Sequence, residues 1–144
     1  MNRYQLPVVA IADMPKVALQ EMNEVHLEEV GLINRLGELV MQGIAGDADL
    51  DEIERVLDEW LLHTRDHFEN ENRLMETYAF PPYPVHKAEH NQVLSRIESL
   101  MAEWSQEQEL VQLADFIFVE WRGWFDQHVN SMDKVTAQFL NQVM

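Results

Sequence analysis

Apolar residues recur every three or four positions over long stretches of this chain, which is the spacing of helices that bury one face. Glycine and proline cluster at three places and divide the pattern into four long segments. Short connections force neighbouring long helices to run antiparallel. We therefore expect an all-α fold, an up-down-up-down antiparallel four-helix bundle with an extended N-terminal arm.

The first predicted helix follows an arm that covers residues 1–13. Asp13 is a suitable N-cap, and Pro15 is tolerated in a first turn because its missing amide hydrogen costs little there. We expect this helix to run to about Met41, ahead of the break GIAGDAD at 43–49. Its inward face is predicted to carry Ala18, Met22, His26, Val30, Ile33, Leu36 and Val40.

The second predicted helix begins after Asp49, which forms a pattern typical of a capping box with Glu52 three residues later. It should end near Thr77, because the prolines of the following YAFPPYP cannot continue the hydrogen-bond ladder. Pro84 is well placed for the first turn of the third helix. Val93, Leu94, Ile97 and Met101 are the apolar positions expected to be buried there.

A fourth helix is expected after a second capping box formed by Ser105 and Gln108. No internal repeat or low-complexity tract divides the chain, so residues 1–144 are predicted to form one domain. The apolar positions of the fourth helix are Leu110, Leu113, Ile117, Phe118, Trp121, Trp124 and Phe125.

The composition narrows the possible functions. The 26 acidic and 10 basic side chains give a formal charge of −16, which repels phosphate backbones and anionic lipid surfaces, so we expect no nucleic acid and no membrane as partner. No apolar run approaches the roughly 20 residues that span a bilayer, and the N-terminus does not resemble a signal peptide, so a cytoplasmic location is expected. The chain has no cysteine. Any metal ion must therefore be held by imidazole and oxygen ligands.

Histidines lie on the inward faces of all four predicted helices. Each buried imidazole needs its own hydrogen-bond partner or costs roughly 1–3 kcal/mol, so several inward rings favour a shared metal site. Residues four apart on a helix share a face, so both members of such a pair can reach one point. The inward histidines, with one acid a turn after the second, are His26, His67, Glu71, His86, His90 and His128.

Two common metal motifs are absent from the sequence. No histidine is preceded three positions earlier by glutamate, which excludes the Glu-x-x-His pairs of ferritin-like di-iron bundles. No His-Glu-x-x-His zinc-protease motif occurs either. Because ligand type alone does not fix the metal, zinc and manganese remain alternatives to iron.

The chain resembles the hemerythrin family over nearly its whole length. The segments HFENENRLM (67–75) and HKAEH (86–90) look like those of the family, and Trp124 precedes a histidine by four residues as the family's last helix does. The residues that match the family in type, order and spacing are His26, His67, Glu71, His86, His90, His128 and Asp133.

The resemblance implies two iron ions per chain and reversible dioxygen binding, for storage, delivery or sensing. With three imidazoles, two bridging carboxylate oxygens and a bridging oxide or hydroxide, one iron has six ligands. The other has five, so one position stays open to a small ligand. The implied arrangement places one iron on His86, His90 and His128 and the other on His26 and His67, with Glu71 and Asp133 as bridges.

Asp133 follows His128 by five residues, and this spacing does not suit a regular helix. Five residues advance about 500° around an ideal helix, which leaves the two side chains about 140° apart. We therefore predict a π-bulge, a kink or the end of regular helix between Val129 and Asp133. The alternative is that Asp133 is a surface acid on an unbroken helix.

The resemblance also implies an apolar pocket for the small ligand. Trp124, Phe125 and Val129 flank His128 and are candidates for its lining, although plain core packing would account for them equally well. Glu29 stands where the family commonly has an apolar residue facing this pocket. An inward Glu29 would favour an enzyme acting on peroxide, O2 or nitric oxide, because it could ligate iron or shuttle protons. The helical pattern favours an outward, solvated carboxylate.

His63 is the sixth histidine and lies one turn before His67, where the family often carries tyrosine. It could support a ligand or replace one. We expect it not to bind metal.

Overall fold

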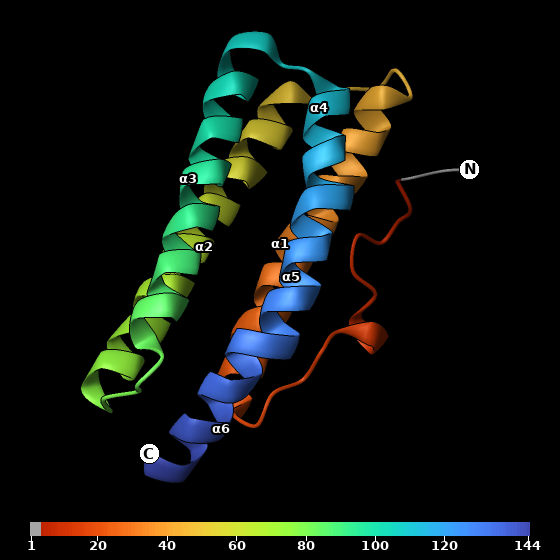
Figure 1. Ribbon diagram of the computed structural model, residues 1–144. Coiled ribbons are helices and arrows are strands. Elements are labelled where there is room, and N and C mark those ends of the chain that lie inside the picture. The colour runs from red at the N-terminus through yellow and green to blue at the C-terminus, as the bar shows by residue number, and fades with distance from the viewer. Residues whose placement is uncertain (1–3) are drawn as a thin grey trace.

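Four helical rods lie side by side, and each runs antiparallel to the next along the chain (Figure 1). The computed structural model describes residues 4–144, so residues 1–3 of the expected arm lie outside the described part. The all-α bundle expected from the sequence is confirmed. The first three rods are α1 (Gln20–Ile44), α2 (Leu50–Thr77) and α3 (Tyr83–Glu107).

The fourth rod is a single helix that includes two π-helical segments. A π-helix closes its hydrogen bonds over five residues instead of four, and such segments are often found at functional sites. The rod consists of α4 (Leu110–Asp115), the π-segment η2 (Phe116–Trp121), α5 (Arg122–His128), the π-segment η3 (Val129–Asp133) and α6 (Lys134–Val143).

The predicted bounds of the second helix are confirmed. Oδ1 of Asp49 accepts a hydrogen bond from the backbone N–H of Glu52 at 3.1 Å, which satisfies one of the free amides at the start of α2. The helix ends at Thr77, and Ala79 then adopts a left-handed conformation with φ of 55°. Pro84 lies in the first turn of α3, as predicted.

The predicted start of the first helix at Asp13 is wrong. The chain there forms only a short 3₁₀ turn, η1 (Ile11–Asp13), and α1 begins at Gln20. The side chain of Asn23 accepts a hydrogen bond from the N–H of Val17 and donates one to its carbonyl, both at 2.9 Å. These two bonds hold the preceding segment extended.

The predicted capping box ahead of the fourth helix is also wrong. Ser105 lies inside α3, which continues to Glu107. The chain turns at Gln108, whose φ of 49° is left-handed, and α4 starts after Glu109 without a side-chain cap. The left-handed backbone conformation of Gln108 therefore ends α3, although this position carries no glycine.

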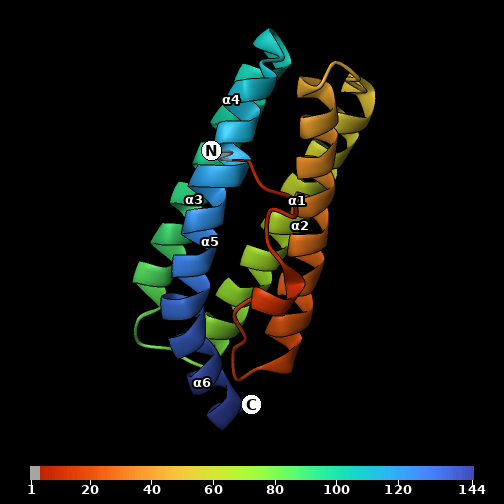
Figure 2. The ribbon, with the colours of Figure 1, turned by 90° about the vertical axis from the view of Figure 1, so that its right-hand side faces the viewer.

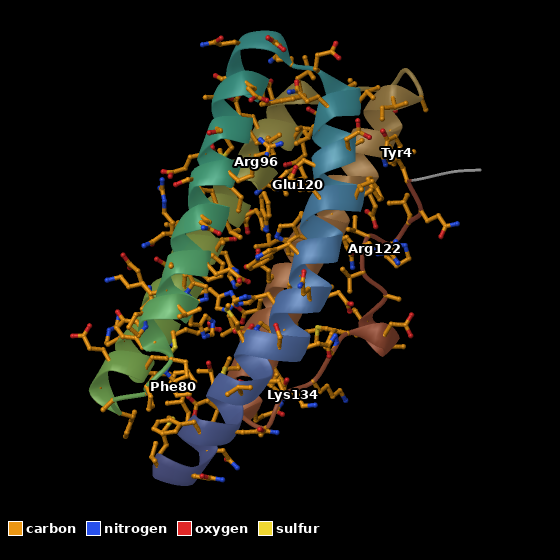
Figure 3. All side chains as sticks on the ribbon, in the orientation of Figure 1. Tyr4, Phe80, Arg96, Glu120, Arg122 and Lys134 are labelled. Atoms are coloured by element: carbon orange, nitrogen blue, oxygen red, sulfur yellow. The ribbon has the colours of Figure 1, made fainter. Side chains whose placement is uncertain are left out.

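The N-terminal arm lies along the outer face of α1 and the fourth rod (Figure 2). Val8 is fully buried, and the absence of a side chain at Gly37 gives it room to approach α1. The side chain of Asn34 bonds to both the N–H and the carbonyl of Val9 at 2.9 Å, so the arm is fixed to α1. At its far end Tyr4 reaches the fourth rod (Figure 3).

Two apolar clusters fill the bundle on either side of a polar layer. The smaller cluster contains Leu19, Met22, Ala137 and Leu140. The larger cluster is built from all four rods and begins on α1 at Val30. The histidine of α1 lies between Met22 and Val30, so the polar layer is enclosed in apolar surroundings. Within residues 4–144, no helix combines the length and apolar character needed to cross a membrane.

Candidate metal centre

Five imidazoles from all four rods converge in the polar layer between the two apolar clusters. Their helical spacing explains this, because each replaces an apolar residue on an inward stripe. The most exposed of them retains 8% of its surface. The five are His26 on α1, His67 on α2, His86 and His90 on α3, and His128 on α5.

The carboxylate of Asp133 lies between two groups of histidines. Its Oδ1 is 3.1 Å from Nε2 of His86 and 3.1 Å from Nε2 of His128. Its Oδ2 is 3.1 Å from Nε2 of His26. Each carboxylate oxygen therefore faces a different group.

Glu71 has the same relation to the two groups from the opposite side. Its Oε2 is 2.6 Å from Nε2 of His67 and 3.9 Å from Nε2 of His26. Its Oε1 is 3.3 Å from Nε2 of His90 and 3.7 Å from Nε2 of His86. Two candidate metal positions result, both with Glu71 among their donors. One set is Glu71, His86, His90, His128 and Asp133, and the other is His26, His67 and Glu71.

The π-helical segment η3 allows Asp133 to join the histidines. It occupies Val129–Asp133, where the sequence spacing predicted a departure from regular helix, and that prediction is confirmed. Asp133 retains 1% of its surface, so the alternative of a surface acid is wrong. The wider turn brings residue 133 onto the same side of the rod as His128.

Several buried polar atoms of this layer lack a hydrogen-bond partner, and this indicates that its residues suit a metal ion. Nε2 of His86 and Nε2 of His128 face each other at 3.2 Å, and the acceptor oxygens of two buried carboxylates crowd the same point. Such groups are costly to bury without partners, and a shared cation would satisfy them together. Among the histidines and carboxylates of this layer, the buried atoms that lack a hydrogen-bond partner within residues 4–144 are Nδ1 and Nε2 of His26, Oε1 of Glu71, Nε2 of His90, and Oδ1 and Oδ2 of Asp133.

The second ring nitrogen of most of these histidines is held by a neighbouring helix. A fixed Nδ1 orients the ring and leaves Nε2 to face the centre, as is usual for histidine ligands of metals. The partners of Nδ1 are Thr136 for His86 at 2.8 Å, Asn72 for His90 at 2.9 Å and Glu89 for His128 at 2.6 Å. None of these three partners was predicted from the sequence, because each contact joins two different helices and the spacing of residues within one helix does not indicate it.

Glu29 points inward, so the expectation of a solvated carboxylate is wrong. It retains 2% of its surface and accepts a hydrogen bond from the hydroxyl of Thr64 at 2.8 Å. Its Oε1 lies 3.1 Å from Nδ1 of His63 and 3.5 Å from Nδ1 of His67. Burial opposes ionisation of Glu29, but the hydrogen bonds to His63 and His67 outweigh it and lower its pKa to about 2.

His63 stands outside the two donor sets. Its side chain retains 18% of its surface, and its Nε2 lies 3.2 Å from Oε2 of the exposed Glu28. The hydrogen bond with Glu29 raises the pKa of His63. The ring therefore links the buried Glu29 to a carboxylate at the surface.

A small cavity of about 10 Å³ lies between the two histidine groups. This is about the space that one water-sized molecule requires. All four residues predicted for a ligand pocket line it, namely Glu29, Trp124, Phe125 and Val129. The remaining lining residues are Thr64, His67, Phe68, Trp121, His128 and Asp133.

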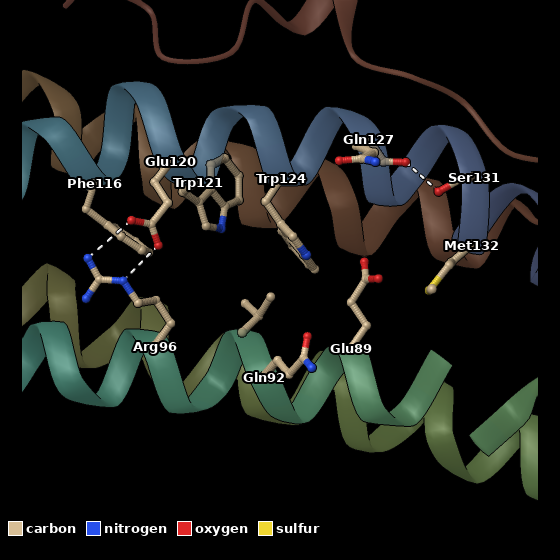
Figure 4. Close-up of a pocket in the computed structure, with 11 residues that line it drawn as sticks. Glu89, Gln92, Arg96, Phe116, Glu120, Trp121, Trp124, Gln127, Ser131 and Met132 are labelled. Atoms are coloured by element: carbon tan, nitrogen blue, oxygen red, sulfur yellow. Dashed lines mark hydrogen bonds and ion pairs between the residues drawn. The ribbon is translucent and has the colours of Figure 1, made fainter. Parts of the chain in front are cut away.

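A larger groove of about 360 Å³ lies on the other side of His128, between α3 and the fourth rod (Figure 4). The indole of Trp124 forms part of its wall and stacks on the ring of His128, with centroids 4.6 Å apart. Arg96 forms an ion pair with Glu120 at one end. Trp124 and Glu89 connect this groove to His128, and none of the residues in the two donor sets lines it.

Comparison with known proteins agrees with this geometry. The family model of the hemerythrin HHE cation-binding domain matches residues 17–140. The chain belongs to the hemerythrin family. This hemerythrin-family chain is 34% identical over 112 residues to a bacteriohemerythrin of Aquifex aeolicus (strain VF5), an alignment that covers 78% of the chain and 82% of that protein. It is 32% identical over 96 residues to a bacteriohemerythrin of Ralstonia nicotianae (strain ATCC BAA-1114 / GMI1000), covering 67% of the chain and 69% of that protein.

The molecule is thus a hemerythrin-family cation-binding domain with buried histidine and carboxylate clusters. The resemblance inferred from the sequence is confirmed. The seven predicted ligand residues all lie in the two donor sets.

Proposed function

We propose that this chain binds dioxygen reversibly at a non-haem di-iron centre. Three imidazoles face one position and two face the other, while each carboxylate directs one oxygen to each side. This asymmetric set of imidazoles, with both carboxylates placed between its two sides, is the observation that carries the proposal. His86, His90 and His128 would hold one iron, His26 and His67 would hold the other, and Glu71 and Asp133 would serve both.

The unequal number of histidines on the two sides would give the centre its reactivity. Fewer protein donors face the ion on the two-histidine side, so that ion would have room for an external ligand. The iron ions would supply the two electrons that reversible dioxygen binding requires. The carboxylates offset the repulsion between two neighbouring cations.

The walls of the small cavity would protect the bound gas from water. The aromatic rings of Trp124 and Phe125 and the side chain of Val129 form the apolar part of its wall, beside the carboxylates of Glu29 and Asp133. Water and stray protons promote loss of the oxygenated state, so an apolar wall beside the bound gas would favour reversible binding. At about 10 Å³ the cavity has room for little more than one water-sized molecule, so a larger substrate would not fit.

Anaerobic reduction of the iron-loaded protein followed by air tests the proposal. We expect two irons per chain and a visible charge-transfer band that appears with air and disappears under vacuum with release of O2. Loading with iron in vitro that yields no such band, or a band that vacuum does not reverse, would contradict it. Native metal content measured on the purified protein distinguishes iron from zinc and manganese.

The inward Glu29 favours a second candidate, an enzyme acting on peroxide, O2 or nitric oxide. This carboxylate lines the cavity and is joined through His63 to Glu28 at the surface. A carboxylate in this place could exchange protons with a bound ligand, and positioned proton transfer contributes about 10²–10⁴-fold to reactions.

Glu29→Leu distinguishes the two functions. The hydroxyl of Thr64 also lies 2.9 Å from the carbonyl of Trp60, so the substitution leaves it a partner, but Nδ1 of His63 and Nδ1 of His67 lose theirs, and we expect stability to fall by about 1–3 kcal/mol. For an oxygen carrier, the leucine variant should keep its oxygenated form longer. For an enzyme, it should lose about 10²-fold or more in the oxidation of a reducing dye by peroxide. Glu29→Gln, which keeps the shape and removes the charge, is the matched control.

A further inference from the structure

A surface groove between α1 and α2 reaches the metal centre directly. It has a volume of about 310 Å³, and His67 and Glu71 are among the residues that line it. Glu71 retains 3% of its surface, and its Oε1 has no hydrogen-bond partner within residues 4–144. The groove therefore reaches two residues of the donor sets.

The donors in this groove form a ladder along one face of α2. His63, His67 and Glu71 follow one another at intervals of four residues, so each lies one turn below the last. The exposed fraction of their side chains falls from 18% to 6% to 3%. Imidazole and carboxylate groups thus extend stepwise from the surface to the interior.

The rim of the groove is acidic. Glu21, Glu28 and Asp66 are exposed and line it, and His63 lies 3.2 Å from Glu28 across the helix pair. No lysine or arginine is among its lining residues in the described part of the chain. Such a concentration of one sign of charge raises the local concentration of cations and their association rate.

Two other grooves beside the centre lack the combination of an acidic rim and a ladder of donor residues. The groove of Figure 4 is lined by no residue of the donor sets. The groove between the start of α3 and α6 reaches His86, but Lys134 lines it and no carboxylate does. A cation following either route would meet no ladder of donors.

We propose that the groove between α1 and α2 is the route by which divalent cations enter and load the metal centre. The carboxylates of the rim attract the hydrated ion, and Glu28 and His63 supply the first donors. His67 and Glu71 then replace further water as the ion moves inward. This inference rests on the metal-binding part of the proposed function and is independent of dioxygen.

Cobalt(II) uptake by the metal-free protein tests the route, because the visible absorption of cobalt changes when histidine nitrogens replace water. The test variant is Glu21→Gln/Glu28→Gln/Asp66→Asn, which neutralises the rim with exposed, near-isosteric substitutions. The control is Glu54→Gln/Asp58→Asn/Glu107→Gln, which removes the same charge at exposed positions outside the groove. At low ionic strength we expect uptake about tenfold slower in the rim variant and less than twofold slower in the control.

Both variants should bind two cobalt ions per chain at equilibrium, since neither changes a donor of the centre. Rising salt should slow uptake by the wild-type protein and have less effect on the rim variant. His63→Ala, which removes the first ring of the ladder, should slow uptake about threefold at unchanged stoichiometry.

Equal rates in the rim and control variants would overturn the route while leaving the metal centre intact. Wild-type protein that binds no cobalt would overturn the centre itself, so the two failures are distinguishable. Circular dichroism of each metal-free variant establishes that the bundle is folded before uptake is measured.

Discussion

Replacing Gly37 with alanine should detach the N-terminal arm from the bundle. A Cβ atom at this position would lie 2.5 Å from Cγ2 of Val8 and 3.2 Å from Cζ of Phe118, both closer than ordinary contact. The branched side chain of Val8 is stiff and fully buried, so it cannot turn away within the core. Both backbone groups of the next residue, Val9, are bonded to Asn34. Even a small shift of the arm to relieve the clash would therefore break these bonds.

The size of the effect follows from three contributions to the free energy of unfolding. Removing Val8 from the core loses about 1.5–3 kcal/mol. Breaking the two bonds between Val9 and Asn34 loses about 1 kcal/mol each at most. Alanine in place of glycine inside a helix gains about 1 kcal/mol. The net expectation is a loss of about 2 kcal/mol, which corresponds to roughly 6 °C in the unfolding midpoint of a chain of this length.

Urea denaturation of the metal-loaded protein measures the loss, and hydrogen exchange at the amide of Val9 reports directly on the arm. Gly31→Ala on the same helix is the matched control, because a Cβ atom there meets nothing within 4 Å. That control should gain about 0.5–1 kcal/mol and leave Val9 protected. A Gly37→Ala variant that is as stable as the control, and in which Val9 exchanges no faster than in the wild type, would refute the expected clash with Val8.

Three further outcomes are expected. Removing the metal ions should lower the unfolding midpoint by roughly 10 °C or more, because the buried donors then lose the cations that satisfy them; calorimetry measures this, and equal midpoints would contradict it. His63→Ala should still bind two metal ions per chain by elemental analysis, and loss of one would make His63 a ligand. Thr136→Val should weaken metal affinity about 10–100-fold, because Nδ1 of His86 loses its partner, whereas Thr136→Ser should retain it; equal affinities in competition with a chelator would refute that role.

The sequence predicted those helix ends that local chemistry determines. Asp49 caps α2 through a side chain three residues from its partner, and the prolines after Thr77 cannot continue a helix. Asp13 and Ser105 offered equally plausible local signals, but neither begins a helix. Asn23 holds the segment before α1 extended through its two bonds to Val17, and α3 continues past Ser105 to Glu107. Capping patterns permit a helix end but do not compel one.

Six of the seven candidate ligands were predictable because each one interrupts an apolar stripe on its own helix, whereas Asp133 was predicted only from the family resemblance. The groups that orient them were not, since Thr136, Asn72 and Glu89 all act across helix boundaries. The inward position of Glu29 could not be predicted for the same reason. The hydrogen bonds that stabilise its buried carboxylate come from Thr64 and His63 on α2, and the sequence of α1 contains no sign of them.

The two sides of the centre differ in how firmly their rings are held. Nδ1 of each histidine on the three-histidine side has a partner at 2.6–2.9 Å. On the other side, the nearest acceptor to Nδ1 of His67 is Glu29 at 3.5 Å, and Nδ1 of His26 has no partner among residues 4–144. The partners of a ligating histidine fix its orientation and raise its basicity, and losing them costs about 10–100-fold in affinity. The two-histidine side, which faces the acidic groove, should therefore release its metal ion more readily.

Graded chelation of the cobalt-loaded protein should consequently remove the two ions in separate steps, with affinities about 10–100-fold apart. Absorption during the titration resolves the steps, because the two ions have different nitrogen counts. Thr136→Val removes the partner of Nδ1 of His86, which is on the three-histidine side. It should therefore weaken the tighter of the two affinities and bring the two release steps closer together. Simultaneous release in the wild type would contradict the argument, as would a separation unaffected by Thr136→Val. Under the proposed function, the open position and the more loosely held ion would be on the same side, so gas binding and metal exchange would both depend on the packing of α1 against α2.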